Sequence, residues 1–204
     1  MQHKILILFA HPSFEKSAVN KALTNYIPRS SGISFHDLYE AYPEFNVDVE
    51  HEKALLDRHD LIIWHHPVYW YSCPPLLKQW IDLVLEFGWA YGPGGTALVG
   101  KKLMQVVTTG GGHAAYQRDG YHQHTLLDFL APMIQTARLC QMEYLPPFVV
   151  HGTHRVSEDE VHHFGRAYEA LLRALSQPDF DFEALRKHEY ANDWIENLNT
   201  QTHG

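Results

Sequence analysis

Apolar strand-like runs alternate with helix-like stretches over most of this chain, and that alternation limits the folds open to it. The strand-like runs lie at residues 4–10, 33–38, 61–66, 103–108 and 148–151. The stretches with apolar residues at helical spacing lie at residues 13–27, 48–58, 74–87, 121–140 and 157–176. Strands joined through helices pair in parallel by right-handed crossovers, with helices on both faces of the sheet. We therefore predict a doubly wound α/β sandwich with a five-stranded parallel sheet.

Several predicted helices contain residues that are favoured at helix ends or that interrupt a helix. Asp48 is expected to cap the second helix. Ser157 and Glu160 have the spacing of a capping box, which predicts the start of the last helix. Pro132 lies inside the fourth helix, where we expect it to kink or break the helix.

The length of 204 residues and the apolar content of 45% are typical of one folded domain with a large core. We expect this domain to span residues 1–176. Residues 177–204 form an acidic extension that contains too many apolar and aromatic side chains for a free tail. We expect the extension to pack on the domain or on a partner subunit.

Charge and composition argue against several classes of function. The formal net charge of −8 disfavours nucleic acid as a partner, because neutralising phosphates requires a basic face. Cys73 and Cys140 lack metal-ligand spacing, so neither a disulfide framework nor a thiolate zinc site is expected. Histidine pairs such as His65-His66 lack a well-spaced third ligand, and we interpret them as surface residues. No apolar run is long enough to span a membrane, and we expect a cytoplasmic protein.

Three loops with chemically useful residues follow the first, third and fourth predicted strands, whose carboxyl ends meet at one edge of the sheet. Residues 11–20 contain a helix N-terminus whose free N–H groups suit a phosphate, although an ordinary capped helix explains the same pattern. Residues 67–75 include three consecutive aromatic residues, which cover either a flat ligand or a subunit interface. Residues 108–112, Thr-Thr-Gly-Gly-Gly, allow close approach to a flat ligand, with Tyr116 and His122 following; a plain glycine-rich turn is the alternative.

A further loop, residues 87–97, interleaves aromatic residues with glycines. It can form a wall over a site, or it can be a long crossover connection. We favour the wall, because long loops in compact domains are often functional.

Taken together, these motifs resemble those of the flavodoxin-like NAD(P)H:quinone oxidoreductases. The motifs that carry the resemblance are His11-Pro12, Ser17-x-x-Asn20, Pro67-Val68-Tyr69-Trp70-Tyr71, Leu76-Leu77-Lys78-Gln79-Trp80, Gly88-Trp89-Ala90-Tyr91-Gly92 and Thr108-Thr109-Gly110-Gly111. They cover roughly residues 4–175, and Leu145-Pro146-Pro147-Phe148 adds similarity to the bacterial branch that includes the ancillary flavoproteins of glutathione-gated potassium efflux antiporters. The resemblance implies a flavodoxin-like fold with strand order 2-1-3-4-5, a bound flavin, and a homodimer with the flavin near the subunit interface.

The resemblance also implies the residues of the flavin site. The implied cofactor-binding residues are His11, Ser17, Ala18, Val19, Asn20, Pro67, Val68, Tyr69, Trp70, Tyr71, Thr108, Thr109, Gly110, Gly111, Gly112 and Tyr116. In the family, the first loop holds the phosphate side, the aromatic loop lines the ring, and the threonine-glycine loop meets the ring edge. Tyr116 and His122 match the tyrosine and histidine that stabilise charge on the flavin during hydride transfer, and they are the implied catalytic residues. No metal is implied.

Two functions are compatible with this resemblance. One is an NAD(P)H dehydrogenase (quinone), which transfers a hydride from NADH or NADPH through flavin to a quinone-like acceptor. FMN is favoured over FAD, because this chain is shorter than the animal relatives that use FAD. The other is an ancillary subunit that activates a glutathione-gated potassium efflux antiporter, peripheral at the inner face of the cell membrane. A plain electron-carrier flavodoxin is a third alternative, although it needs no substrate wall such as residues 87–91.

Overall fold

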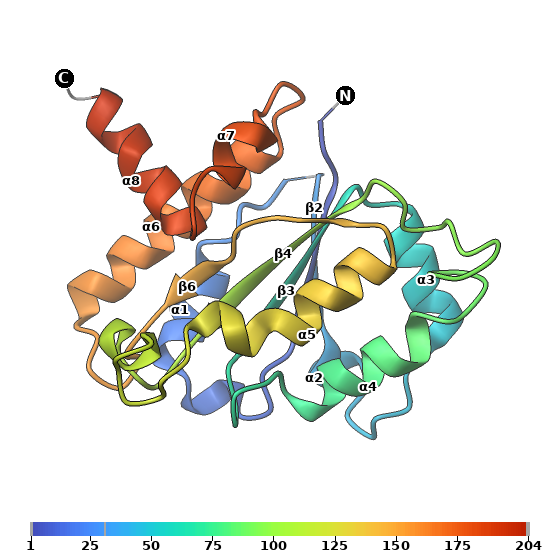
Figure 1. The fold of residues 1–204 in the computed structure, drawn as a ribbon, viewed down its shortest axis with the longest axis horizontal. Helices are drawn as coiled ribbons and strands as arrows, with labels where there is room; N and C mark the ends of the chain where they lie inside the picture. The colour runs from blue at the N-terminus through green and yellow to red at the C-terminus, as the bar shows by residue number, and fades with distance from the viewer. Residues whose placement is uncertain (1, 31, 203–204) are drawn as a thin grey trace.

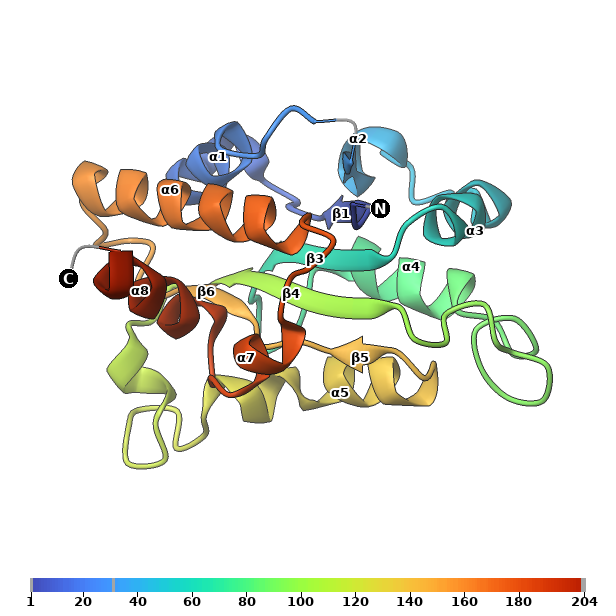
Figure 2. The ribbon, with the colours of Figure 1, turned by 90° about the horizontal axis from the view of Figure 1, so that it is seen from above.

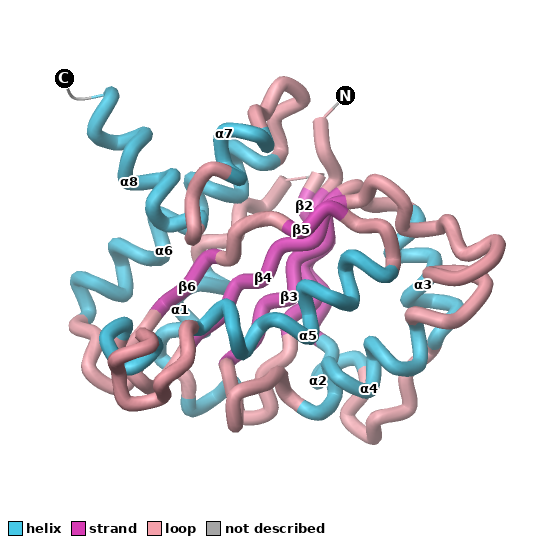
Figure 3. The backbone as a smooth tube through the Cα atoms, in the orientation of Figure 1, coloured by secondary structure: helices cyan, strands magenta, loops and turns pink. Residues whose placement is uncertain are grey.

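A computed structural model describes residues 2–30 and 32–202 and shows a parallel sheet between two layers of helices (Figures 1 and 3). The strands are β1 (Ile5–Phe9), β2 (Ile33–Asp37), β3 (Leu61–Pro67), β4 (Lys102–Thr108), β5 (Glu143–Tyr144) and β6 (Phe148–Val150). Their order is β2-β1-β3-β4-β5, and β6 also pairs with β4. The predicted doubly wound sheet and its strand order are confirmed.

The fifth position of the sheet is shared by two short strands, where the sequence indicated one strand at residues 148–151. β5 pairs with the first two residues of β4, and β6 pairs with the last three. Between them lie Pro146 and Pro147, which have no N–H to donate. The ladder is therefore interrupted at this point, and one edge position becomes two strands.

Helices of the two layers cover opposite faces of the sheet (Figure 2). The helices are α1 (Ala18–Asn25), α2 (Leu38–Ala41), α3 (Val49–Asp57), α4 (Pro75–Val84), α5 (Leu126–Leu139), α6 (Glu158–Leu175), α7 (Phe182–Arg186) and α8 (Ala191–Thr202). Ile5 and Ile7 of β1 join the core that α1 and α6 cover, whereas Leu6 and Leu8 join the core under α3, α4 and α5. This alternation is the pleat of a strand buried on both faces, which explains its uniformly apolar sequence.

Burial on both faces also corrects the interpretation of His65 and His66 as surface residues. Both lie in β3 and have no exposed area. Burial lowers the pKa of His65 to about 3 and that of His66 to about 4, so both rings are neutral at neutral pH. Coverage of both faces of β3, which the histidine spacing does not reveal, therefore decides their environment.

The first predicted helix, residues 13–27, is shorter than expected. A separate 3₁₀ turn forms at Phe14–Lys16 (η1), and α1 begins only after Ser17. Ser17 ends the turn because its hydroxyl accepts a hydrogen bond from the Asn20 N–H and caps α1. The loop after β1 is therefore longer, which leaves room for a site at the start of α1.

The fourth predicted helix, residues 121–140, also begins late. Thr125 and Asp128 form a capping box there, so residues 121–124 belong to a loop. Pro132 lies within α5 and does not divide it. The predicted cap at Asp48 and the capping box at Ser157 are confirmed.

The segment after residue 176 contains α7 and α8, which the sequence patterns did not separate. Leu185, Ala191 and Ile195 are buried in the core beside α6. The Asn192 side chain donates to the Val149 carbonyl (3.0 Å) and accepts from the Val149 N–H (2.8 Å), so it occupies the free edge of β6. The division into a domain and an extension remains a prediction. Among the described residues, no helix has both the length and the apolar character that a membrane crossing needs.

A buried carboxylate connects several elements on the α3 side of the sheet. Glu52 accepts hydrogen bonds from Tyr42 Oη (2.5 Å) and Trp80 Nε1 (2.7 Å), and His36 Nε2 lies 2.7 Å from it. Burial alone would raise the pKa of Glu52, but the hydrogen bonds from these partners outweigh burial and lower that pKa below its usual value. The ionised carboxylate is therefore the form that holds the network together.

We expect Glu52→Gln to destabilise the protein by about 1–3 kcal/mol, because an amide leaves a buried donor unsatisfied. Because the pKa of Glu52 is lower in the folded state, its stabilising contribution is complete above the unfolded pKa of about 4.3 and is lost as the pH falls through the folded value. Urea unfolding of the parent protein and of Glu52→Gln, at neutral pH and at about pH 4, measures this loss of stability and its dependence on pH. Glu50→Gln is the matched control, since the Glu50 side chain is 85% exposed on the same helix. Equal losses in the two variants would contradict the assignment.

Candidate functional site

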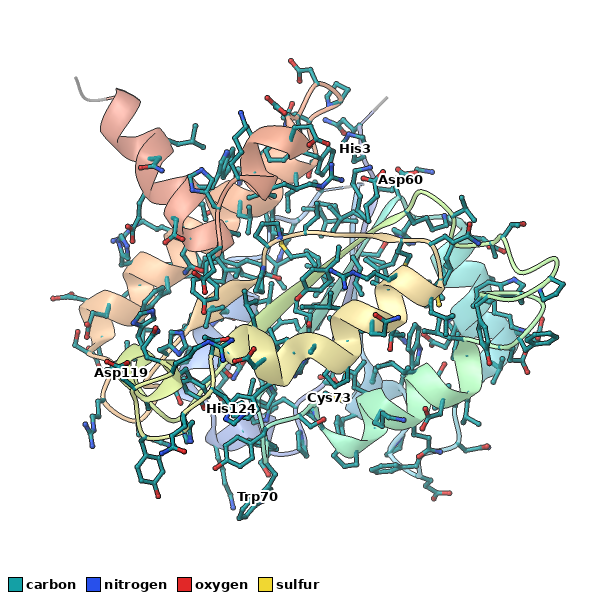
Figure 4. The ribbon with its side chains drawn as sticks, in the orientation of Figure 1. His3, Asp60, Trp70, Cys73, Asp119 and His124 are labelled. Carbon is teal, nitrogen blue, oxygen red and sulfur yellow. The ribbon has the colours of Figure 1, made fainter. Side chains whose placement is uncertain are left out.

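A cavity of about 340 Å³ opens at the carboxyl ends of the strands. It is lined by His11, Ser13, Lys16, Ser17, Ala18, Val19, Asn20, Pro67, Val68, Tyr69, Thr108, Gly110, Thr153 and His154. These residues come from the loops after β1, β3, β4 and β6, where the direction of strand addition reverses beside β1. In Figure 4 this edge carries the labelled Trp70, opposite His3 and Asp60 at the other end of the sheet.

Many of the residues implied at the sequence level lie together here, and some lie just outside. His11, Ser17 to Asn20, Pro67 to Tyr69, Thr108 and Gly110 line the cavity. Trp70, Tyr71, Thr109, Gly111, Gly112 and Tyr116 do not line it. Sequence reasoning missed Ser13, Lys16, Thr153 and His154. The last two follow β6, so the rule that all strand ends share one edge was sufficient to include them.

The start of α1 presents unpartnered backbone donors to the cavity. Ser17 Oγ accepts from the Asn20 N–H (3.2 Å). The N–H groups of Ala18 and Val19 have no acceptor among the described residues. Free N–H groups at a helix N-terminus attract an anion, and the Lys16 side chain at the rim adds positive charge. This part of the cavity is suited to a phosphate.

Asn20 organises the floor of the cavity. Its Nδ2 donates to Ser17 Oγ (2.9 Å) and to Thr108 Oγ1 (3.1 Å), while its Oδ1 accepts from His65 Nε2 (3.2 Å). Both of its donors are thus engaged, and the side chain is 2% exposed. Asn20 therefore ties the start of α1 to β3 and β4, and it supports the loop that faces the ligand.

His11 is held as a neutral ring at the mouth of the same loop. Its Nδ1 accepts from the Ser13 N–H (3.1 Å), so the proton lies on Nε2. Burial lowers the pKa of His11, and an interaction of the ring with the backbone of His11 itself offsets only part of that effect. The ring also lies edge-on to Tyr69, with their centroids 6.0 Å apart.

The aromatic loop turns sharply at two residues with left-handed backbone conformation. Tyr69 and Ser72 exchange two backbone hydrogen bonds of 3.0 Å, and Trp70 (φ 48°) and Tyr71 (φ 64°) form the tip. Positive φ is strained for bulky residues and is often tolerated where function requires it. The turn leaves the Trp70 side chain 93% exposed, while Tyr71 packs on Phe129 with their centroids 4.8 Å apart.

The threonine-glycine loop approaches Tyr116 and His122 closely. A Cβ placed on Gly111 would lie 3.2 Å from the Tyr116 ring and 3.5 Å from His122 Nε2. The Tyr116 and His122 rings lie 4.6 Å apart, and the His122 N–H donates to the Ala115 carbonyl (3.0 Å). The two predicted catalytic side chains are thus neighbours beside the glycine loop. Burial raises the pKa of Tyr116, and an interaction with the Thr109 hydroxyl offsets part of the increase.

A second buried network lies directly behind the aromatic loop. Tyr144 Oη donates to Gln105 Oε1 (2.9 Å), and Gln105 Nε2 donates to His66 Nε2 (3.1 Å). His66 Nδ1 then donates to the Pro67 carbonyl (3.0 Å). This chain of hydrogen bonds fixes the end of β3, where the loop begins. Sequence patterns gave no signal for it, because it depends on register between β3 and β4.

Comparison with known proteins places the chain in a family. Residues 3–174 match the flavodoxin-like fold family, and the chain belongs to that family. It is 41% identical to the glutathione-regulated potassium-efflux system ancillary protein KefG of Erwinia tasmaniensis over 165 residues, which cover 81% of this chain and 90% of the relative. The corresponding protein of Cronobacter sakazakii is 43% identical over 169 residues, covering 83% and 92%.

Two solved structures support the same assignment. The general stress protein 14 of Treponema denticola in complex with FMN has a TM-score of 0.81 and 40% identity, over 84% of this chain and 99% of that one. An NADPH-quinone reductase from P. pentosaceus has a TM-score of 0.76 and 33% identity, over 83% and 97%. The resemblance proposed from the motifs is confirmed at the level of the family and of both groups of relatives.

We expect Asn20→Ala to destabilise the protein by about 1–3 kcal/mol, because it leaves the buried His65 N–H without an acceptor. Urea unfolding followed by circular dichroism measures the loss. Asn25→Ala is the control, since Asn25 lies exposed on the same helix and should stay within about 0.5 kcal/mol of the parent protein. If Asn20→Ala matched that control, the side chain would not be the link between α1 and the sheet.

Proposed function

We propose that this protein is an FMN-dependent oxidoreductase that moves electrons from NADH or NADPH to a quinone-like acceptor. The observation that carries the proposal is the cavity at the strand ends, which has unpartnered amide groups at the start of α1 and is bordered by the glycine loop. The Tyr116–His122 pair lies against that loop. The relatives add support: one similar structure is described in complex with FMN, and another is named an NADPH-quinone reductase.

The residues present fit FMN. The phosphate of FMN suits the N–H groups of Ala18 and Val19, with Lys16 at the rim. The N–H groups of Gly110 and Gly111 also lack an acceptor among the described residues, and they suit the polar edge of a flat ring. The cavity has the size and the mixed polar and apolar lining typical of small-molecule sites. FMN, when bound, supplies the redox chemistry, and the protein supplies position and electrostatics.

Tyr116 and His122 supply a donor and a proton-holding group next to the glycine loop. A phenol whose pKa is raised by burial stays protonated at neutral pH, so Tyr116 can donate a hydrogen bond to developing negative charge. The neighbouring His122 imidazole has ring nitrogens that can donate or accept a proton. The pair can therefore stabilise charge and transfer a proton to a reduced acceptor.

We further propose that the active form is a homodimer with the site near the interface. Trp70 at the tip of the aromatic loop is 93% exposed, and Tyr121 is 87% exposed. Large aromatic side chains are costly to leave in water and often mark an interface.

The second candidate is an ancillary role in potassium efflux, peripheral to the membrane. The similarity to the KefG proteins favours it, because it spans 90–92% of their length at 41–43% identity. This role is compatible with the enzyme. Co-purification with the antiporter from membranes, and antiporter-dependent potassium loss that requires this protein, would support it.

Purified protein is expected to carry FMN and to oxidise NADH or NADPH only when a quinone is present. Mass spectrometry of the released cofactor, a quinone-reductase assay and sedimentation of the flavin-loaded protein test the three parts of the proposal. Absence of a flavin band even after added FMN would exclude the enzyme. An active, flavin-loaded monomer at micromolar concentration would exclude the dimer.

Tyr116→Phe and His122→Gln are expected to retain FMN but to slow its reduction by NAD(P)H. Loss of a donor at a fully formed oxyanion site costs about 2.7–4 kcal/mol, and we expect a smaller loss here because His122 is only half-buried. Anaerobic stopped-flow reduction of the bound flavin is the deciding measurement. Asn25→Ala again serves as the control. Reduction of both site variants at the parent rate would contradict the catalytic assignment and leave the FMN site intact.

A further inference from the structure

His151, the residue that follows β6, makes an ordered hydrogen-bond chain into the threonine-glycine loop. Its Nδ1 lies 3.0 Å from Thr109 Oγ1. Thr109 Oγ1 donates its hydrogen to the Gly111 carbonyl (2.8 Å), so the histidine nitrogen must be the donor in the first contact. The ring is therefore the Nδ1–H tautomer, with an unprotonated Nε2. Burial and the nearby His113 lower the pKa of His151 to about 4, so the ring is neutral at neutral pH.

The ring of His151 is half-buried and packs against three aromatic side chains. Its centroid lies 5.4 Å from that of Tyr116, 5.3 Å from that of His113 and 6.4 Å from that of Tyr190. Nε2 is buried and has no hydrogen-bond partner in the described part of the chain. Tyr190 belongs to the segment beyond the family match, which ends at residue 174. His151 is thus held against the loop by these ring contacts and by its hydrogen bond to Thr109.

The hydrogen bonds made by His151 and Thr109 determine how one peptide of the loop is oriented. The Gly111 carbonyl accepts from Thr109 Oγ1 and also from the Gly152 N–H (2.9 Å). Because a trans peptide is planar, its carbonyl and the following N–H point in opposite directions. Holding the Gly111 carbonyl toward Thr109 and Gly152 therefore directs the Gly112 N–H away from them. The Tyr116 ring packs against His151, with its centroid 5.4 Å from that of the His151 ring.

We propose that His151 is a positioning residue of the flavin site, which acts through Thr109 to fix the Gly111–Gly112 peptide and the Tyr116 side chain. The inference rests on the proposed function and deepens it. It assigns to the loop after the last strand a role in setting how the glycine loop meets the flavin ring. His151 itself does not line the cavity, so its effect must pass through Thr109 and the loop.

The test removes the Nδ1–H donor of His151 and keeps an aromatic ring at this position. His151→Phe is expected to weaken FMN binding by about fivefold to tenfold, the effect of one buried hydrogen bond. In the apoprotein it should also speed hydrogen exchange of peptides that cover residues 108–117. His151→Asn places an amide N–H near the position of Nδ1 and should restore both readouts to within about twofold. Thr109→Val should reproduce His151→Phe, and the double variant should be no worse than the worse single variant.

His59→Phe is the matched control. His59 is buried more deeply than His151 and makes two hydrogen bonds, to Ser34 Oγ (2.7 Å) and to the Leu55 carbonyl (2.6 Å), away from the strand-end cavity. It should lower overall stability without a selective change in exchange at residues 108–117. Parent-like exchange in His151→Phe, no rescue by His151→Asn, or independent effects of His151→Phe and Thr109→Val would overturn the proposal. If the parent protein does not bind FMN, the proposed function fails, whereas apoprotein exchange still decides whether His151 positions the loop.

Discussion

Burial of the central sheet on both faces is the constraint on which the rest of this structure depends. Once helices cover both faces, a polar side chain on a central strand is costly unless it has a partner inside the protein. His65 forms a hydrogen bond with Asn20, and His66 forms hydrogen bonds with Gln105 and the Pro67 carbonyl. Two of these partners, Asn20 and Pro67, line the cavity. The hydrogen bonds that satisfy buried polar side chains of the central strands thus also hold the functional loops in place.

The same constraint explains how much of the fold could be predicted from the sequence. A strand covered on both faces is uniformly apolar, so the alternation of such runs with helical stretches was enough to predict the parallel sheet. It was not enough to predict the division of the last strand, which follows from Pro146 and Pro147 interrupting a ladder. It also misplaced His65 and His66, because periodicity shows where a strand lies but not how the histidines within it are paired.

The site was predictable in its location more than in its details. Strand ends of a parallel sheet converge, so the first, third and fourth loops were expected to meet, and they do. The sequence could not show that Asn20 points inward to its partners, nor that Trp70 turns outward at a strained backbone position. Both depend on contacts between residues far apart in the chain. His151 carried no motif, and its contact with Thr109 becomes visible only when β4 and β6 are placed side by side.

The two hydrogen bonds between the Asn192 side chain and the Val149 backbone have a consequence for folding during translation. The two residues are 43 positions apart, so the edge of β6 is synthesised well before the side chain that covers it. At about 5–20 residues per second, the delay is roughly 2–9 s. During that interval the nascent sheet presents unpaired backbone groups, to which another chain can add. Wrong association at this edge is therefore favoured between the synthesis of β6 and that of α8, and the arrival of α8 ends that interval.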